Sequence, residues 1–376
     1  LVVSNQGFFD FKDDTKIAID TQLADYLAQS VPYNLFVIQD KYLAICTLSG
    51  LLITTRDGKL IQFLNKERGI SSNLILNATL GPSGILWVGT FNGIDAIEIL
   101  SPYSIFDSRH GIDGNINQVE WIGDYIYVAT SSGVYRQKWL AFQQALKDIK
   151  FEKITSDITW ALLKTQTGIM VLAQNNIRII EEGVTTQLIP NNGELYWSGV
   201  VNDKQAYLGS STGKIMCLTK TASYWEITHT LDTEFNDIRY MTSGPHNTFW
   251  VSNRSQGIYH FRLDKNTKSI QDAQLYSQKD GLPDDVENYV YQMQGNQYFA
   301  TLNGFYQFNR TKNSFERDSS FTKSVGNEPI LVLSEDNEGN IYYFSDHLYS
   351  LNQKEGNLVK QQLTNSRISE YYLPVS

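Results

Sequence analysis

A short phrase, Thr-x-x-Gly set between two runs of alternating apolar residues, returns at near-regular intervals along this 376-residue chain. The best copy is Thr90-Phe-Asn-Gly93. With the Gly or the residue in its place taken as a marker, the phrase falls at nine positions: Gly7, Gly50, Gly93, Gly133, Asn176, Gly213, Gly257, Gly304 and His347. Eight intervals span 340 residues, a mean of 42.5. A period of about 40 to 45 residues with several short strands in each repeat is typical of a ring or array of small β-sheets.

Each repeat predicts four antiparallel strands, and the Thr-x-x-Gly turn joins the second to the third. In the best copy, Asn92-Gly93 indicates a tight hairpin whose two central residues take positive φ. Period-2 alternation and abundant Tyr, Phe, Val, Ile and Thr exclude a helical solenoid. The expected fold is therefore an all-β β-propeller of four-stranded blades with nine repeats. The innermost strands are predicted at Tyr33–Gln39, Leu74–Gly81, Ile116–Ile122, Thr159–Lys164, Leu195–Val201, Asp237–Thr242, Glu287–Gln292 and Ile330–Ser334.

The two chain ends complement each other. Residues 1–11 supply a second and a third strand with no first strand before them, and Ile368–Val375 reads as an innermost strand with nothing after it. One blade built from both ends would remove two unpaired strand edges and give a single ring over residues 1–376.

Two segments depart from the strand pattern. Thr21–Ser30 and Lys138–Lys150 carry apolar residues at helical spacing, which predicts a short amphipathic helix in each.

Composition narrows the classes of partner. The net charge of −9 argues against a nucleic-acid backbone, and the absence of a run of about 18 apolar residues argues against a membrane span. Cys46 and Cys217 lie far apart in apolar strands, so we expect separate buried thiols. The five histidines are scattered at no metal-ligand spacing, so we expect neither a metal site nor a cofactor.

The repeats resemble a known family, the two-component regulator propeller repeat of bacterial sensor proteins. The resemblance is carried by Gly69-Ile-Ser-Ser-Asn-Leu74 with Leu86-Trp-Val-Gly-Thr-Phe-Asn-Gly-Ile94, and by Asp280-Gly-Leu-Pro283 with Ala300-Thr-Leu-Asn-Gly304. It implies a sensor domain at the periplasmic or extracellular face of a bacterial membrane. It also implies tethering through downstream segments, with the output domain beyond them. Members of this family often carry two seven-bladed rings in tandem, which implies an alternative to the single ring: a seven-bladed ring over residues 73–376, preceded by the end of another ring in residues 1–72. A homodimer is a further option.

In a propeller, the turns after the second strands and the connections between blades lie on the same face. Aromatic planes beside fixed Asn, Asp and Arg groups suit a sugar, whose ring has an apolar face and hydroxyls at its edge. Trp160 and Tyr196 begin inner strands near this mouth, whereas Trp87 and Trp250 are expected to be buried between blades. The predicted ligand contacts are Arg68, Asn92, Arg109, Trp197, Arg239, Arg254 and Asp284.

These features favour a non-catalytic, extracytoplasmic ligand-binding sensor domain whose ligand is a carbohydrate or another small molecule. One alternative is a propeller enzyme, a glycosidase or lyase, which would need a carboxylate pair or a metal at the mouth. The densest acidic group is Asp284, Asp285 and Glu287. The other alternative is a protein-interaction platform.

Overall fold

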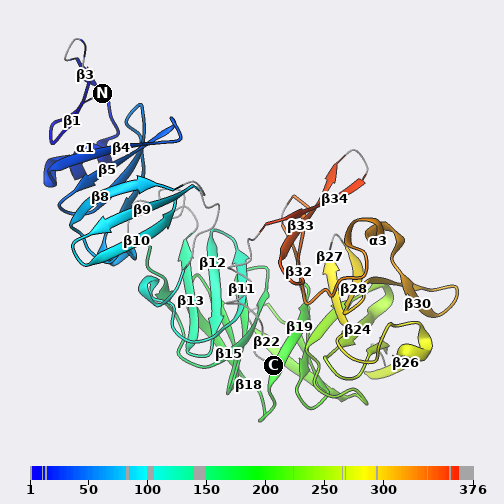
Figure 1. Ribbon diagram of the computed structural model, residues 1–376. Coiled ribbons are helices and arrows are strands. Elements are labelled where there is room, and N and C mark those ends of the chain that lie inside the picture. The colour runs from blue at the N-terminus through cyan, green and yellow to red at the C-terminus, as the bar shows by residue number, and fades with distance from the viewer. Residues whose placement is uncertain are drawn as a thin grey trace. The chain divides into compact units, whose positions relative to one another are not determined.

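The computed structural model describes residues 2–10, 12, 15–81, 84–99, 106–138, 149–222, 224–264, 266, 268–293, 295–336, 338–354 and 357–363. The chain divides into two compact units. The first unit comprises Leu1–Asp113 and Arg136–Lys153, and the second comprises Gly114–Tyr135 and Ile154–Ser376. Among the described residues the strands form nine antiparallel sheets, seven with four strands and two with three, each in simple chain order (Figure 1).

The first unit holds three of these sheets. Their strands are β1 (Val2–Ser4), β2 (Gly7–Phe9) and β3 (Lys16–Ile17); β4 (Pro32–Ile38), β5 (Tyr42–Thr47), β6 (Leu51–Thr55) and β7 (Leu60–Leu64); and β8 (Ile75–Leu80), β9 (Ile85–Thr90) and β10 (Gly93–Glu98). Its helices are α1 (Thr21–Gln29) and the 3-10 helices η1 (Lys66–Arg68) and η2 (Ser108–His110).

Strands β11 and β12 of the second unit belong to a sheet with β13 and β14, and five further sheets follow. The strands are β11 (Ile116–Ile122), β12 (Tyr125–Thr130), β13 (Gly133–Lys138) and β14 (Glu152–Lys153); β15 (Thr159–Lys164), β16 (Ile169–Ala173), β17 (Asn176–Glu181) and β18 (Val184–Pro190); β19 (Tyr196–Val201), β20 (Gln205–Ser210), β21 (Lys214–Lys220) and β22 (Trp225–Asp232); β23 (Tyr240–Ser243), β24 (Thr248–Ser252), β25 (Ile258–Asp264) and β26 (Ser269–Tyr276); β27 (Tyr289–Met293), β28 (Asn296–Thr301), β29 (Gly304–Asn309) and β30 (Ser314–Arg317); and β31 (Val332–Glu335), β32 (Ile341–Phe344), β33 (Leu348–Lys354) and β34 (Asn357–Gln362). Its helices are η3 (Pro245–Asn247), η4 (Gln278–Asp280) and α3 (Ser319–Val325).

The buried hydroxyl of the Thr-x-x-Gly phrase explains why the phrase repeats. Thr47 Oγ1 donates to the Gly50 carbonyl at 2.8 Å and accepts from the second turn residue, Ser49 N, at 3.1 Å. Thr301 Oγ1 makes the same two bonds, at 2.8 Å to the Gly304 carbonyl and at 3.0 Å from the second turn residue. The side chain thus ties both ends of the turn together through hydrogen bonds that close within four residues of chain.

The expected geometry of the best turn is wrong in detail. Gly93 pairs with Thr90 as the first residue of β10, so the two turn residues are Phe91 and Asn92. Neither of these takes positive φ; only Gly93 does, at 157°. The Thr90 hydroxyl donates to the Gly93 carbonyl and so closes a turn whose two central residues are Phe91 and Asn92. Gly93 therefore follows the turn and does not occupy its second central position.

Successive sheets of the second unit pack face to face. Ala161 and Leu172 of one sheet share a core cluster with Leu208 and Trp225 of the next. Every residue of β16 is buried, because a middle strand of a blade has a neighbouring sheet on both faces. The innermost strands β11, β15, β19, β23, β27 and β31 follow one another side by side.

The connections between blades also repeat. In η1, η2 and η4 a 3-10 turn ends at a glycine with positive φ, and the next residue is buried: Ile70, Ile112 or Leu282. The Gly-Ile and Gly-Leu pairs of the family phrase are therefore chain reversals whose apolar residue anchors the connection in the core.

The predicted innermost strands agree with the observed ones to within a few residues; Ile116–Ile122 and Thr159–Lys164 match β11 and β15. The helix predicted at Thr21–Ser30 is confirmed as α1. The segments needed to test the helix at Lys138–Lys150 and the strand at Ile368–Val375 lie almost wholly outside the described residues. Neither nine blades in one ring nor closure by the chain ends is confirmed, and both stay predictions.

The two tryptophans expected between blades differ. Trp250 is 6% exposed and packs against Tyr276, Phe299 and Phe308. Trp87 is 46% exposed, so its assignment to the core is wrong. It lies on β9 in the three-stranded sheet β8–β10, and no other aromatic ring is recorded against it among the described residues.

Candidate functional site

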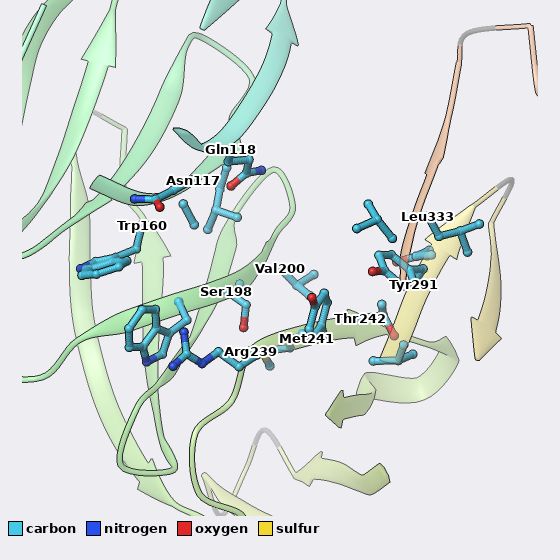
Figure 2. A pocket seen from close by; sticks show the side chains of 18 of the residues that line it. Asn117, Gln118, Trp160, Ser198, Val200, Arg239, Met241, Thr242, Tyr291 and Leu333 are labelled. Atoms are coloured by element: carbon cyan, nitrogen blue, oxygen red, sulfur yellow. The ribbon is translucent and has the colours of Figure 1, made fainter. Parts of the chain in front are cut away.

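The six innermost strands of the second unit surround a pocket of about 970 Å³. Figure 2 shows Trp160, Ser198 and Arg239 in one part of it and Tyr291 and Leu333 in another. The pocket is lined by Asn117, Gln118, Val119, Glu120, Trp160, Ala161, Leu163, Trp197, Ser198, Gly199, Val200, Asp237, Arg239, Tyr240, Met241, Thr242, Arg254, Val290, Tyr291, Gln292, Val332, Leu333 and Ser334.

An aromatic corner occupies the part of the pocket next to β15 and β19. Trp160 and Trp197 meet edge to face with ring centroids 4.5 Å apart. The Arg239 guanidinium lies over the Trp197 ring, 3.5 Å from its centroid, and Arg239 Nε donates to Asp237 Oδ1 at 2.8 Å. The indole and the carboxylate together fix the plane of the guanidinium, so its position in the pocket is set in advance.

A second arginine lines the pocket from the turn after β24. Arg254 Nε donates to Glu287 Oε1 at 3.0 Å, and the other Glu287 oxygen accepts a hydrogen bond from the Tyr289 hydroxyl. Asp237 and Glu287, the two carboxylates that orient the arginines, both have φ of 54°. Non-glycine residues adopt this left-handed backbone conformation uncommonly and at an energetic cost.

Two tyrosines form the wall between these arginines and β31. The rings of Tyr240 and Tyr291 lie 5.5 Å apart, and their hydroxyls are hydrogen-bonded. Burial raises the pKa of Tyr240, although the Tyr291 hydroxyl and the charges of Arg254 and Arg239 act in the opposite direction. Burial also raises the pKa of Tyr291 well above its usual value, so both phenols are neutral donors at physiological pH.

Amide side chains tie neighbouring inner strands together beside the pocket. Gln118 of β11 accepts from Leu162 N at 2.9 Å and donates to the Leu162 carbonyl at 3.1 Å. Asn117 Nδ2 donates to the Thr159 carbonyl at 2.7 Å, and Ser198 Oγ donates to the Ile238 carbonyl at 3.1 Å. Inner strands of adjacent blades are not paired by main-chain ladders, so these side chains help to hold the wall rigid.

One carboxyl group of the wall has a raised pKa. Burial raises the pKa of Glu120, against the lowering effects of the Gln118 amide, which donates to Glu120 Oε1 at 2.9 Å, and of Lys164.

Two polar atoms of the lining are buried without a hydrogen-bond partner among the described residues, Trp197 Nε1 and Thr242 Oγ1. Thr242 is 5% exposed. Such orphaned polar atoms are uncommon in native structures and mark places where a partner would be stabilising.

The structure brings together three of the seven predicted contacts, Trp197, Arg239 and Arg254, at this pocket. Asp284 is exposed, does not line the pocket, and accepts from Asp285 N at 2.7 Å. The other three belong to the first unit: Arg68 donates to the Phe63 carbonyl, Arg109 pairs with Asp107 at 2.7 Å, and Asn92 is an exposed turn residue.

The densest acidic group is occupied by structural bonds. Asp285 Oδ1 accepts from Gln278 N at 2.6 Å, and Glu287 is held by Arg254 and Tyr289. Among the described residues no cluster of three or more His, Cys, Asp or Glu could hold a metal ion. Beside the carboxyl groups of Glu120 and Asp237, the lining offers aromatic faces, amides, phenols and two oriented guanidinium groups, which is chemistry suited to binding.

Sequence reasoning missed most of the lining. Asn117, Gln118, Tyr240, Thr242 and Tyr291 lie within or beside inner strands, whereas the predicted contacts were sought mainly in turns and connections. The signal was present, because the inner strands themselves were predicted. Polar and aromatic residues inside those strands are the ones that line the pocket.

The comparison with solved structures supports the fold. The extracellular domain of a protein named as a one-component system from B. thetaiotaomicron matches with a TM-score of 0.52 and 14% identity, over 90% of this chain and 49% of that one. The extracellular domain of a protein named as a hybrid two-component system from the same organism matches with a TM-score of 0.35 and 12% identity, over 88% of this chain and 57% of that one. No family model matches the chain, and no curated protein matches it.

The chain spans about half the length of the first of these domains. At this identity the likeness shows the fold: small antiparallel sheets arranged as in an extracellular domain of a bacterial signalling protein. The resemblance to the two-component regulator propeller repeat is confirmed at that level. In the part of the chain that the structure describes, no helix is long and apolar enough to cross a membrane.

Proposed function

We propose that this chain is a non-catalytic, extracytoplasmic ligand-binding sensor domain of a bacterial signalling protein, and that it binds a carbohydrate in the pocket of the second unit. The observation that carries the proposal is the corner formed by Trp160, Trp197 and Arg239. It combines partly buried aromatic side chains with a fixed polar group at a pocket of about 970 Å³.

The chemistry of the lining supports a sugar. One face of a pyranose ring is apolar and stacks on an indole, while its hydroxyls need donors and acceptors at the ring's edge. Beside the tryptophans, the lining supplies amides (Asn117, Gln292) and hydroxyls (Ser198, Tyr240) from several blades. The volume lies at the upper end of the ~300–1,000 Å³ typical of small-molecule sites, which leaves room for an oligosaccharide.

Binding without turnover is the simpler reading of the acidic residues. A glycosidase needs two carboxyl groups that flank the scissile bond. Asp284 and Asp285 accept backbone hydrogen bonds and do not line the pocket. Glu120 and Asp237 do line it, but each is hydrogen-bonded to a neighbouring side chain, Gln118 and Arg239 respectively. The attachment to a membrane through downstream segments, the periplasmic or extracellular location and a homodimer rest on the resemblance and belong to the same proposal.

Calorimetric titration of a panel of oligosaccharides tests the proposal. We expect at least one to bind, and Trp197→Ala to weaken its binding by about 2 kcal/mol through lost stacking. Trp121→Ala is the matched control, because Trp121 is also in the second unit and 46% exposed but does not line the pocket. Turnover of a bound glycan that Asp284→Asn or Asp285→Asn abolishes would overturn the non-enzymatic claim. If both tryptophan variants lose affinity equally, the ligand does not bind at this aromatic corner.

A further inference from the structure

We infer that the pocket of the second unit selects an acidic sugar, and that Arg239 and Arg254 together bind its carboxylate or sulfate group. This inference rests on the proposed function and names the class of its ligand. It is carried by the way in which one blade presents two oriented guanidinium groups to one pocket.

The pairing of β23 with β24 sets where the two arginine side chains begin. Tyr240 and Ser252 are register partners, and Arg239 N donates to the Ser252 carbonyl at 3.1 Å. Arg239 directly precedes β23, and Arg254 follows β24 by two residues. The two side chains therefore start from the same end of one strand pair, and both line the pocket.

Each guanidinium is held through its Nε. Arg239 Nε donates to Asp237, and Arg254 Nε donates to both oxygens of Glu287, at 3.0 and 3.4 Å. No hydrogen bond from an Nη atom of either arginine is recorded to any described residue. Their side chains are 38% and 57% exposed, so the Nη donors are accessible from the pocket.

The Tyr240 hydroxyl adds a neutral donor to the same pocket. The charges of both arginines act on this phenol, which places it within electrostatic reach of each. A guanidinium whose Nε edge is taken by a protein carboxylate keeps Nη donors for a second anion, and charge-assisted bonds to carboxylate or sulfate are about twice as strong as neutral ones.

A neutral sugar would use this arrangement poorly. Its hydroxyls would accept from the Nη groups without supplying charge, whereas an anion adds the electrostatic attraction of two nearby guanidinium groups. The Arg239 plane is already stacked on Trp197 at 3.5 Å. A sugar ring at the aromatic corner would therefore bring a ring carboxylate or sulfate next to the arginines.

The test compares matched pairs of probes by calorimetry on the whole chain. One set is uronic-acid oligosaccharides beside their carboxyl-reduced forms, and the other is sulfated disaccharides beside their desulfated forms. We expect an anionic probe to bind at least about tenfold more tightly than its neutral counterpart, with a gap that narrows as salt is raised.

Arg239→Gln and Arg254→Gln should each weaken the anionic probe by about tenfold and its neutral counterpart by clearly less, so that the affinity gap between the two probes narrows. Arg262→Gln is the matched control: Arg262 also donates through Nε to a carboxylate, Asp272 at 2.8 Å, in the second unit, but does not line the pocket. Unchanged melting temperatures establish that the variants fold.

The outcomes separate the two claims. If the tightest probe is neutral, loses affinity in Trp197→Ala and ignores both arginine variants, the acidic-sugar inference is wrong and the proposed function stands. If no probe of either kind binds, both are overturned. If the anionic probe binds and Arg262→Gln weakens it as much as Arg254→Gln does, general charge attraction rather than this pair explains the selectivity, and the inference fails.

Discussion

Two groups of predicted ligand contacts behave differently. Trp197, Arg239 and Arg254 of the second unit line one pocket. Arg68 and Arg109 of the first unit lie in connections between blades, as Arg239 does, but Arg68 donates to the Phe63 carbonyl and Arg109 pairs with Asp107. A position in a connection between blades is therefore not sufficient to bring a residue to a ligand-binding pocket.

The difference lies in what stands beside each arginine. Arg109 is joined to Asp107 within one 3-10 turn, at the surface. Arg239 is anchored in a similar way by Asp237, but an indole from the preceding blade lies beneath it. A binding site forms where an inner strand of a neighbouring blade supplies side chains that pack against such an arginine.

The largest expected effect compares double variants of the two groups. Trp197→Ala with Arg239→Ala should weaken oligosaccharide binding by about 2–4 kcal/mol, because stacking and charge-assisted bonds are lost together. Trp87→Ala with Arg109→Ala, an exposed tryptophan and an exposed arginine of the first unit, should leave the affinity unchanged. Calorimetric titration measures both, and equal losses would end the distinction between the groups.

The repeated turn should also differ between the units. A Cβ on Gly304, at φ 90°, would lie 2.7 Å from the Gly326 carbonyl oxygen, whereas a Cβ on Gly93 would meet nothing nearer than Ser71 Oγ at 4.0 Å. We expect Gly304→Val to cost about 2–3 kcal/mol of unfolding free energy and Gly93→Val about 1 kcal/mol. Denaturant unfolding measures both, and a Gly93 variant as damaged as the Gly304 variant would contradict the assigned steric cause.

Smaller effects with opposite pH dependence are expected at one carboxyl group in each unit. Hydrogen bonds from Arg109 lower the pKa of Asp107 to about 2, so its stabilising contribution is present above the unfolded pKa of about 4 and is lost as the pH falls toward 2. Burial raises the pKa of Glu120, because the buried carboxylate is less stable than the neutral acid. The free energy of unfolding is therefore highest with respect to this group below about pH 4.3, and it decreases as the pH rises through the folded pKa.

Melting temperatures across pH 3 to 8 check these signs. Asp107→Asn should lose stability relative to the parent at neutral pH, by a small amount because the pair is exposed, and this difference should shrink on acidification. Glu120→Gln should gain stability relative to the parent as the pH rises. Parallel curves for the two variants would mean that at least one cause is misassigned.

The smallest contrast is expected between the two thiols. Cys46 of the first unit and Cys217 of the second are both free and buried, and burial raises their pKa values to about 11 and about 12. Neither should react with a thiol reagent at pH 8 until the chain is unfolded. Selective labelling of Cys46 in the native protein would show that the first unit opens more readily than the second.

Much of the fold was predictable because its determinants are local. The hydroxyl bonds of Thr47 and Thr301 close within four residues of chain, so the turn recurs wherever the phrase does. The site was predictable only in part. The prediction missed Tyr240, Thr242 and Tyr291 because their neighbours in space are strands tens of residues away. The prediction that Trp87 is buried failed for the same reason. The alternating apolar pattern around Trp87 resembles that around the buried Trp250, so the pattern alone could not distinguish them.

By itself, the sequence determined the repeat, the positions of the inner strands and the chemistry of each turn and connection, because hydrogen bonds and hydrophobic periodicity over a few residues specify them. Only the tertiary structure decided which polar groups meet. Pairing Tyr240 with Ser252 starts Arg239 and Arg254 at the same end of one strand pair, and packing one blade on the next brings Trp160 to Trp197. Both are long-range contacts set by strand register and sheet packing, and no single repeat encodes them.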